Sequence, residues 1–199
     1  MLRTLILCLG LSILPTVANS QELTVNYGYV WSDSINVYQS GFVPKRVGIE
    51  DMDDISASLD FNYQRNETIG LFVSQQSAQM EGTPSRFEQG LTLQHVQFVG
   101  SKLYPQGNWT HRVSLGLGFT YLSPDEREFS SHTRLSGQLA VGTRFAVTPK
   151  VAIGVEARWL PIFMNNSGYI FCNGGCSVGF GSDNILNQFS VGAGVTFRF

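Results

Sequence analysis

Charged residues are scarce in this 199-residue chain. They make up 14% of it, against about 25% in an ordinary soluble domain. The 13 basic and 15 acidic residues leave a net charge of −2, so the sequence lacks the basic surface that a nucleic-acid partner requires. The 14 Phe and 7 Tyr argue against intrinsic disorder. The length allows one domain or at most two.

Long apolar runs are scarce as well. One runs from Leu5 to Leu14, preceded by Arg3 and followed by the small residues Ala18 and Ser20, a pattern typical of a secretory signal. We therefore expect a signal peptide at 1–20 and a mature domain at 21–199. After residue 20 no apolar stretch is long enough for a membrane-spanning helix, so a mature chain embedded in a membrane would have to be a barrel.

Cysteine is limited to three residues, and Cys8 lies within the predicted signal peptide. The remaining two, Cys172 and Cys176, are an even number in an exported chain, which favours one disulfide. Gly174 and Gly175 between them allow a tight loop to close. We recognise no nucleotide, haem or zinc motif and expect no cofactor and no metal.

Alternation of apolar and polar residues with a period of two fills most of the mature chain. In 188–199 one face collects only apolar residues, ending in Phe197 and Phe199. Most of the predicted strands reach the ~9–11 residues that a membrane-crossing strand needs, whereas soluble strands have a mode of about 5–6. There are eight of them: 22–31, 54–64, 68–76, 90–104, 110–121, 135–146, 151–160 and 187–199.

The connections between these strands alternate between short and long. The short ones lie around Asn66, at 105–109 and at 147–150, and the long ones are 32–53, 77–89, 122–134 and 161–186. This asymmetry is typical of outer-membrane barrels with periplasmic turns and extracellular loops. We therefore predict an all-β fold, an eight-stranded antiparallel up-and-down transmembrane β-barrel with periplasmic N- and C-termini.

Aromatic residues support this topology, because Trp and Tyr favour the two membrane interfaces. The topology predicts an outer girdle of Tyr29, Trp31, Tyr121, Trp159 and Phe163, and an inner girdle of Tyr63, Tyr104, Trp109, Phe145, Phe197 and Phe199. The strand at 90–104 is irregular. Leu91 and Leu93 lie at odd positions and Val96 and Phe98 at even positions, so in a regular strand the two pairs would face opposite sides. A bulge near residues 94–95 would reconcile them.

The final residues from Val195 to Phe199 are similar to the signal by which the outer-membrane assembly machinery recognises its clients. The mature chain as a whole resembles the small eight-stranded barrels of Gram-negative outer membranes, the OmpA-like, OmpX-like and OmpW-like superfamily. This resemblance implies three partners, namely outer-membrane lipid, lipopolysaccharide and the assembly machinery. It also implies a monomer, with Phe197 and Phe199 as the assembly signal.

The predicted lumen holds acids and arginines on the inward faces of the strands. They are Asp60, Arg112, Arg144, Glu156, Arg158 and Arg198. We expect Glu156 to lie among guanidiniums from both neighbouring strands, Arg144 and Arg198. An eight-stranded barrel has an interior only wide enough for side chains, and inward glycines make room for them. A polar plug is therefore favoured over a solute pathway, and a lumenal catalytic site is favoured least.

Other polar residues offer weaker functional signals. Ser130 and His132, with Asp125, Glu126 and Glu128 nearby, resemble the lipid A deacylases in residue types alone. His95 and His111 are expected to be interface or turn residues. The acids within 50–54 could bind cations that bridge lipopolysaccharide phosphates, although a solvated rim is favoured. The loop at 165–183 is suited to a partner, a hydrophobic solute or packing over the barrel mouth.

The hypothesis that follows is a barrel with a structural or surface-interaction role and no enzymatic activity. The alternative is OmpW-like passage of small molecules, hydrophobic ones included, and a lipid-modifying enzyme is third. Apolar residues in the upper lumen would favour the transporter, whereas a closed network of arginines and acids would favour the structural role.

Overall fold

The computed structural model describes residues 21–33, 35–39, 45–49, 52–81, 90–124, 131–163, 176–178 and 185–199. The predicted signal peptide at 1–20 lies outside these ranges and stays a prediction. None of the described residues forms a helix long and apolar enough to cross a membrane.

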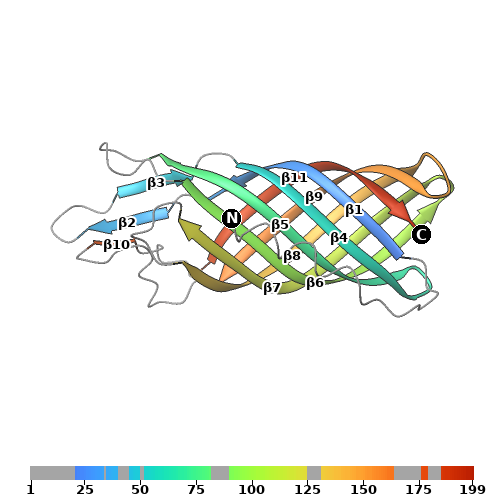
Figure 1. Ribbon diagram of the computed structural model, residues 1–199, viewed down its shortest axis with the longest axis horizontal. Coiled ribbons are helices and arrows are strands. Elements are labelled where there is room, and N and C mark those ends of the chain that lie inside the picture. Colours follow the sequence, from blue (N-terminus) through green and yellow to red (C-terminus); the bar gives the residue numbers. More distant parts are fainter. Residues whose placement is uncertain are drawn as a thin grey trace, which may run out of the picture.

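Eight long antiparallel strands form a closed barrel (Figure 1). Each pairs with the neighbouring long strands in the chain, and the first pairs with the last along its whole length. This confirms the predicted all-β, eight-stranded antiparallel fold. The strands are β1 (Gln21–Ser32), β4 (Met52–Gln64), β5 (Glu67–Glu81), β6 (Gly90–Gln106), β7 (Trp109–Pro124), β8 (His132–Ala146), β9 (Val151–Phe163) and β11 (Ile185–Arg198).

Three further short strands lie beyond one end of the barrel (Figure 1). These are β2 (Ile35–Gln39), β3 (Lys45–Ile49) and β10 (Cys176–Val178). β2 pairs with both β10 and β3, and the end of β3 pairs with the end of β5. They lie in two long connections that we predicted as loops. Strand pairing between two connections far apart in sequence has no signature in the periodicity of either one.

The two ends of the barrel differ as predicted. At one end, called the turn end below, tight connections at 65–66, 107–108 and 147–150 join consecutive strands. Asn66 (φ 63°) and Gly107 (φ 60°) adopt the left-handed conformation that such turns need. The opposite end, called the loop end, carries the four long connections. Both chain ends of the barrel meet at the turn end, where Gln21 and Phe199 exchange backbone hydrogen bonds of 3.1 and 3.0 Å.

The outer wall is apolar along most strands, and its aromatic side chains gather near the two ends. Nearly all the residues of the two predicted girdles are exposed on the outside, and Phe145 is half-buried. Trp109 and Phe145 pack against each other at the turn end with ring centroids 5.0 Å apart. Tyr29 and Trp31 make an edge-to-face contact of 5.1 Å near the loop end. The two predicted girdles are therefore confirmed as outward-facing aromatics.

The predicted bulge in β6 is wrong. The pairing of β6 with β5 and β7 runs without a shift from Leu91 to Lys102. Leu91 and Leu93 point into the barrel, on the same face as the buried His95, while Val96 and Phe98 point outward. The parity conflict arose because we assumed a uniformly polar lumen, whereas the loop-end part of the lumen is apolar.

Candidate functional site: the barrel lumen

Asp60 and Arg112 form a two-pronged ion pair near the turn end. The Arg112 guanidinium donates from Nη1 and Nη2 to the two carboxylate oxygens of Asp60, at 2.9 and 3.0 Å. Its Nε lies within hydrogen-bond distance of Ser101 and Ser114, at 3.0 and 2.8 Å. Ser58 donates to the carboxylate at 3.1 Å. A buried pair with this many hydrogen bonds keeps both charges compensated.

Glu22 holds two other arginines at the same end. Its carboxylate lies 2.6 Å from Arg144 Nη1 and 2.9 Å from Arg198 Nε. We predicted that both arginines would surround Glu156, and that prediction is wrong. Closure of the barrel places β1 beside β11 with Glu22 directly opposite Arg198. The inward parity that Glu22 shares with Thr24 and Asn26 is the sequence signal that could have identified it.

Arg158 lies deeper in the lumen and contacts three other side chains. It forms an ion pair with Glu156, approaches Asp54 at 3.7 Å, and places its guanidinium 4.1 Å from the centre of the Phe72 ring. Asp54 is only 3% exposed, so its predicted place in an acidic rim is wrong. The sequence signal for its inward position was that Asp54 and Asp60, six residues apart on β4, face the same side of the strand. Of the rest of that acidic cluster, Glu50 and Asp51 lie outside the described residues.

The charged residues of these three clusters balance one another. Four carboxylates face four guanidiniums, and every one of them has an oppositely charged partner within 4.0 Å. We refer to this set as the charged network: Glu22, Asp54, Asp60, Arg112, Arg144, Glu156, Arg158 and Arg198. The six residues predicted from the sequence all belong to it, and Glu22 and Asp54 complete it.

Glycines on the inner wall make room for this network. A Cβ added at Gly70 would lie 2.5 Å from Asp60 Oδ1, and one at Gly154 would lie 2.8 Å from Arg144 Cβ. These distances are shorter than van der Waals contact, and the backbone oxygens of Leu59 and Thr143 lie at 2.5 and 2.6 Å, so a larger residue would displace the paired strand together with the charged side chain. The predicted role of the inward glycines is therefore confirmed at Gly154 beside Arg144, and Gly70, which was not predicted, leaves space in the same way for Asp60.

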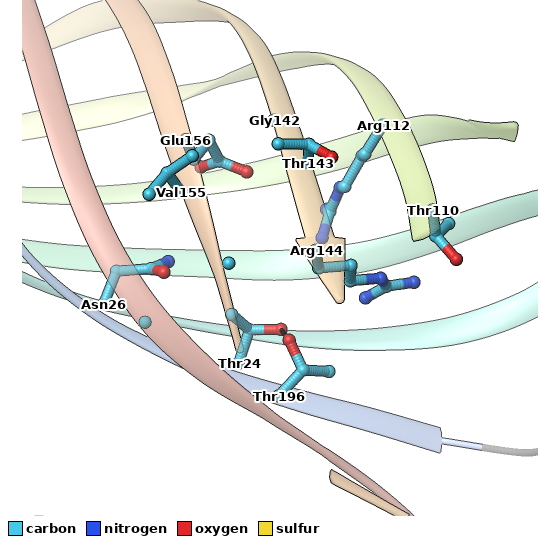
Figure 2. A pocket seen from close by; sticks show the side chains of 12 residues that line it. Thr24, Asn26, Thr110, Arg112, Gly142, Thr143, Arg144, Val155, Glu156 and Thr196 are labelled. Atoms are coloured by element: carbon cyan, nitrogen blue, oxygen red, sulfur yellow. Dashed lines mark hydrogen bonds between the residues drawn. The ribbon is translucent and has the colours of Figure 1, made fainter. Parts of the chain in front are cut away.

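A small cavity remains within the turn-end part of the lumen. It measures about 30 Å³ and lies among Arg112, Arg144, Glu156 and the hydrogen-bonded hydroxyls of Thr24 and Thr196 (Figure 2). A water molecule needs about 10–15 Å³ by this measure, so the cavity accommodates about two. A second cavity of about 10 Å³ lies beside Asp54 and Arg158. Both spaces suit water and are too small for a larger solute.

Uncharged polar side chains form the next level toward the loop end. His95 is fully buried, and its Nδ1 lies 2.7 Å from the Thr120 hydroxyl. Gln97 donates from Nε2 to Ser136 Oγ at 3.0 Å and to the Gly137 carbonyl at 3.2 Å. Our expectation of His95 as an interface or turn residue is wrong, because β6 turns its side chain into the lumen. His111 is exposed on the outer wall, as expected for an interface residue.

Apolar side chains fill the lumen at the loop end. Each is 3% exposed or less, and each shares the inward parity of its strand. We call this set the apolar layer: Val30, Met52, Leu91, Leu93, Leu122, Leu160, Ile162 and Leu186. This layer closes the barrel by apolar packing, without ion pairs. We predicted a polar lumen from the sequence, so the layer was not expected.

The other predicted sites are only partly described. Cys172 lies outside the described residues and Cys176 begins β10, so the disulfide stays a prediction. Ser130 and its neighbouring acids also lie outside them, while His132 is half-buried at the start of β8. Phe197 and Phe199 are exposed at the turn end. In the described ranges, no three His, Cys, Asp or Glu side chains are grouped to hold a metal.

Comparison with known proteins finds similarity in structure alone. No family model matches the sequence, and no curated protein sequence matches it. Neisserial surface protein A (NspA) has a similar structure, with a TM-score of 0.59 and 14% identity over 90% of this chain and 97% of NspA.

Two further solved structures are similar over most of their length. The outer-membrane protein AlkL, solved in lipid bilayers, aligns with a TM-score of 0.56 and 11% identity over 91% of this chain and 90% of AlkL. The outer-membrane protease OmpT from Escherichia coli aligns with a TM-score of 0.50 and 9% identity over 94% of this chain and 99% of OmpT. Likeness at these identities concerns the fold alone. This chain has the closed antiparallel fold of outer-membrane β-barrel proteins, built here from eight strands.

Proposed function

We propose that this protein is an integral outer-membrane barrel with a plugged lumen, and that it serves a structural or surface-interaction role. The observation that carries the proposal is the filled interior. The charged network fills the lumen from the turn end inward to Asp54 and Arg158, and the apolar layer fills the loop end. A rigid, closed wall with long connections at one end suits the display of those connections.

The outer wall supports insertion into a membrane. Exposed Val, Leu, Ile and Phe side chains cover most of the outer faces of the strands between the aromatic residues at the two ends, as the acyl chains of a bilayer require. We assign the turn end and both termini to the periplasm and the long connections to the cell surface. Outer-membrane lipid and lipopolysaccharide are then the partners of the wall.

The last strand supports recognition by the outer-membrane assembly machinery. Phe197 and Phe199 are both exposed at the turn end, where a strand-end aromatic is accessible before β11 pairs with β1. Deleting Phe199 is expected to reduce the amount of protein in the outer membrane, measured by the folded band on an unheated gel. Val147→Ala, a change of another exposed apolar residue at the turn end, is the control. Equal amounts of both variants would argue against this role.

A role without catalysis is part of the proposal. Within the described lumen the acids are paired with arginines, and His95 Nδ1 lies 2.7 Å from the Thr120 hydroxyl. OmpT is a protease by name, but the similarity to it concerns the fold. Incubating the folded protein with lipopolysaccharide and phospholipid, followed by mass spectrometry of the lipids, is expected to show no change in acyl chains.

Conductance tests the plugged lumen directly. Purified protein in a planar bilayer is expected to give no steady ion current, because paired charges and packed apolar residues block the interior. A porin in the same bilayer serves as the positive control. Large, stable channels from the wild-type protein would contradict the proposal.

The apolar layer favours a second candidate, OmpW-like passage of small hydrophobic molecules. Its eight residues present an apolar surface to the loop end of the lumen, where such a solute would first arrive. Uptake of naphthalene into cells that produce the protein would support passage if it exceeds uptake into cells without it. Leu93→Asp, which introduces a charge into the layer, would have to abolish the difference.

A further inference from the structure

The outer face of the β5–β6 hairpin has an unusually short apolar stretch. Between Glu67 and Gln75 on β5 and between Gln94 and Lys102 on β6, its outward apolar side chains are Ile69, Leu71, Val73, Val96 and Phe98, and the exposed Tyr104 lies beyond Lys102 toward the turn end. On the neighbouring β7, by contrast, five consecutive outward positions from Val113 to Tyr121 are apolar or aromatic. We call the surface of 67–75 and 94–102 the hairpin face.

A polar pair bounds the hairpin face at each end. Near the loop end, Gln94 Nε2 donates to Gln75 Oε1 at 3.3 Å, and both side chains are exposed. Near the turn end, Lys102 forms an ion pair with Glu67 at 2.5 Å. Each pair joins residues directly opposite each other in the β5–β6 register.

The distance between these pairs is short for a membrane. Eight residues separate Glu67 from Gln75, about 26 Å along a strand at about 3.3 Å per residue. With a strand tilt of about 40°, the height is about 20 Å, below the ~25 Å apolar band of outer-membrane barrels. A wall this short is accommodated by thinning of the bilayer, by snorkelling of the flanking Lys102, or by another protein that covers it.

We propose that the hairpin face is a contact surface for a second copy of this chain, related by a two-fold axis parallel to the barrel axis. In such a dimer the same patch meets itself, so each contact has to be self-complementary. Both bounding pairs meet this condition. Each amide of Gln75 and Gln94 carries a donor and an acceptor, and Glu67 and Lys102 carry opposite charges. Polar groups that bond across the interface are removed from lipid.

The shape of the hairpin face supports the same partner. Phe98 is 74% exposed, the highest value among the large apolar residues of the described chain. Gly100, the next outward position on β6, has open space where a Cβ would lie. A protruding ring beside a notch lets two copies interlock, whereas fluid acyl chains need neither feature. This inference departs from the monomer expected from the sequence, and it rests on the proposed membrane insertion.

Cysteine cross-linking in membranes tests the dimer. Val96→Cys on the hairpin face and Val191→Cys on β11, across the barrel, replace two valines that are each 50% exposed. Both are made in the full chain with Cys8→Ser, Cys172→Ser and Cys176→Ser, and oxidised in proteoliposomes of outer-membrane lipid. Val96→Cys is expected to give a covalent dimer several-fold more abundant than Val191→Cys, across a range of protein-to-lipid ratios.

A larger side chain at Gly100 tests dimerisation independently of folding of the barrel. Gly100→Leu meets open space within one copy, so the barrel should fold and insert while cross-linking at residue 96 is lost. Ala193→Leu on β11, another exposed small residue, should leave cross-linking unchanged. Equal cross-linking at 96 and 191, or cross-linking that survives Gly100→Leu, would overturn the proposal. The folded gel band and the membrane fraction of each variant report insertion, so failure of the proposed membrane location is distinguished from failure of the dimer.

Discussion

The two halves of the lumen close the barrel by different physical means. In the turn-end half, each guanidinium needs a carboxylate at a specific position, supplied in most cases by a strand far away in sequence, as with Glu22 and Arg198. In the loop-end half, the apolar layer packs without directional bonds. Removing one partner of a buried ion pair strongly destabilises the fold, whereas replacing one apolar side chain by another of similar volume costs little stability. The turn-end half therefore depends on correct strand register, and the loop-end half on total volume.

Removing the Glu22 carboxylate should have the largest effect. Glu22→Ala leaves Arg144 and Arg198 without their anion inside the lumen, and breaking a buried pair costs about 3–5 kcal/mol. The free energy of unfolding would be measured by urea titration in micelles, following the shift from folded to unfolded gel band. Glu22→Ala combined with Arg144→Met should be less destabilised than Glu22→Ala alone. A double variant as unstable as the sum of the two single variants would contradict the pairing.

Leu93→Ala should be the next most damaging change. Leu93 is fully buried in the apolar layer, and removing its side-chain carbons leaves a cavity that costs about 2–5 kcal/mol. Leu93→Met keeps the volume and should cost less than about 1.5 kcal/mol. The same urea titration applies, with Leu115→Ala on the exposed outer wall as a control for the loss of a leucine. If Leu93→Met were as harmful as Leu93→Ala, the layer would demand shape as strictly as the charged network demands charge.

Glu156→Ala should have a smaller effect than Glu22→Ala, although both remove a lumenal carboxylate. Glu156 is 18% exposed in its side chain, and its partner Arg158 keeps Asp54 at 3.7 Å and the Phe72 ring. Partial exposure and these remaining contacts should reduce the loss to about 1–2 kcal/mol, between the values of surface and buried pairs. Thermal melting should register it as a small decrease in Tm. A loss as large as that of Glu22→Ala would place Glu156 at the centre of the network after all.

Single-group changes should give the smallest effects and the sharpest comparison. Thr196→Val removes one hydroxyl of the Thr24–Thr196 pair, which is 3.0 Å apart, at about 0.5–1.5 kcal/mol. Ile162→Val removes one methylene from the apolar layer at a similar cost. Combining each change with Glu22→Ala in a double-mutant cycle distinguishes the two halves of the lumen. The threonine change should show coupling in a double-mutant cycle, because both lie in the turn-end half, and the isoleucine change should add independently.

The outer wall was far more predictable than the lumen. The girdle residues on β1, β7 and β9 face outward as expected, because alternation along one strand is a local property. Lumenal partners join strands from opposite ends of the chain. Glu22 was missed because its importance appears only when β1 meets β11, and Asp54 was assigned to the rim because neighbouring acids in sequence suggested a cluster. Leu91 and Leu93 were misread because the sequence does not reveal where along the axis the lumen changes from polar to apolar.

The sequence by itself determined the number of barrel strands, their alternation and the order of short and long connections. Each of these follows from a period of two and from turn residues such as Asn66 and Gly107, which act within a few residues of each other. Only the tertiary structure decided which carboxylate each arginine binds, that His95 lies inside, and that β2, β3 and β10 extend the loop end. Closure and stagger of the barrel set those choices, because they bring together side chains whose separation in the chain carries no local pattern.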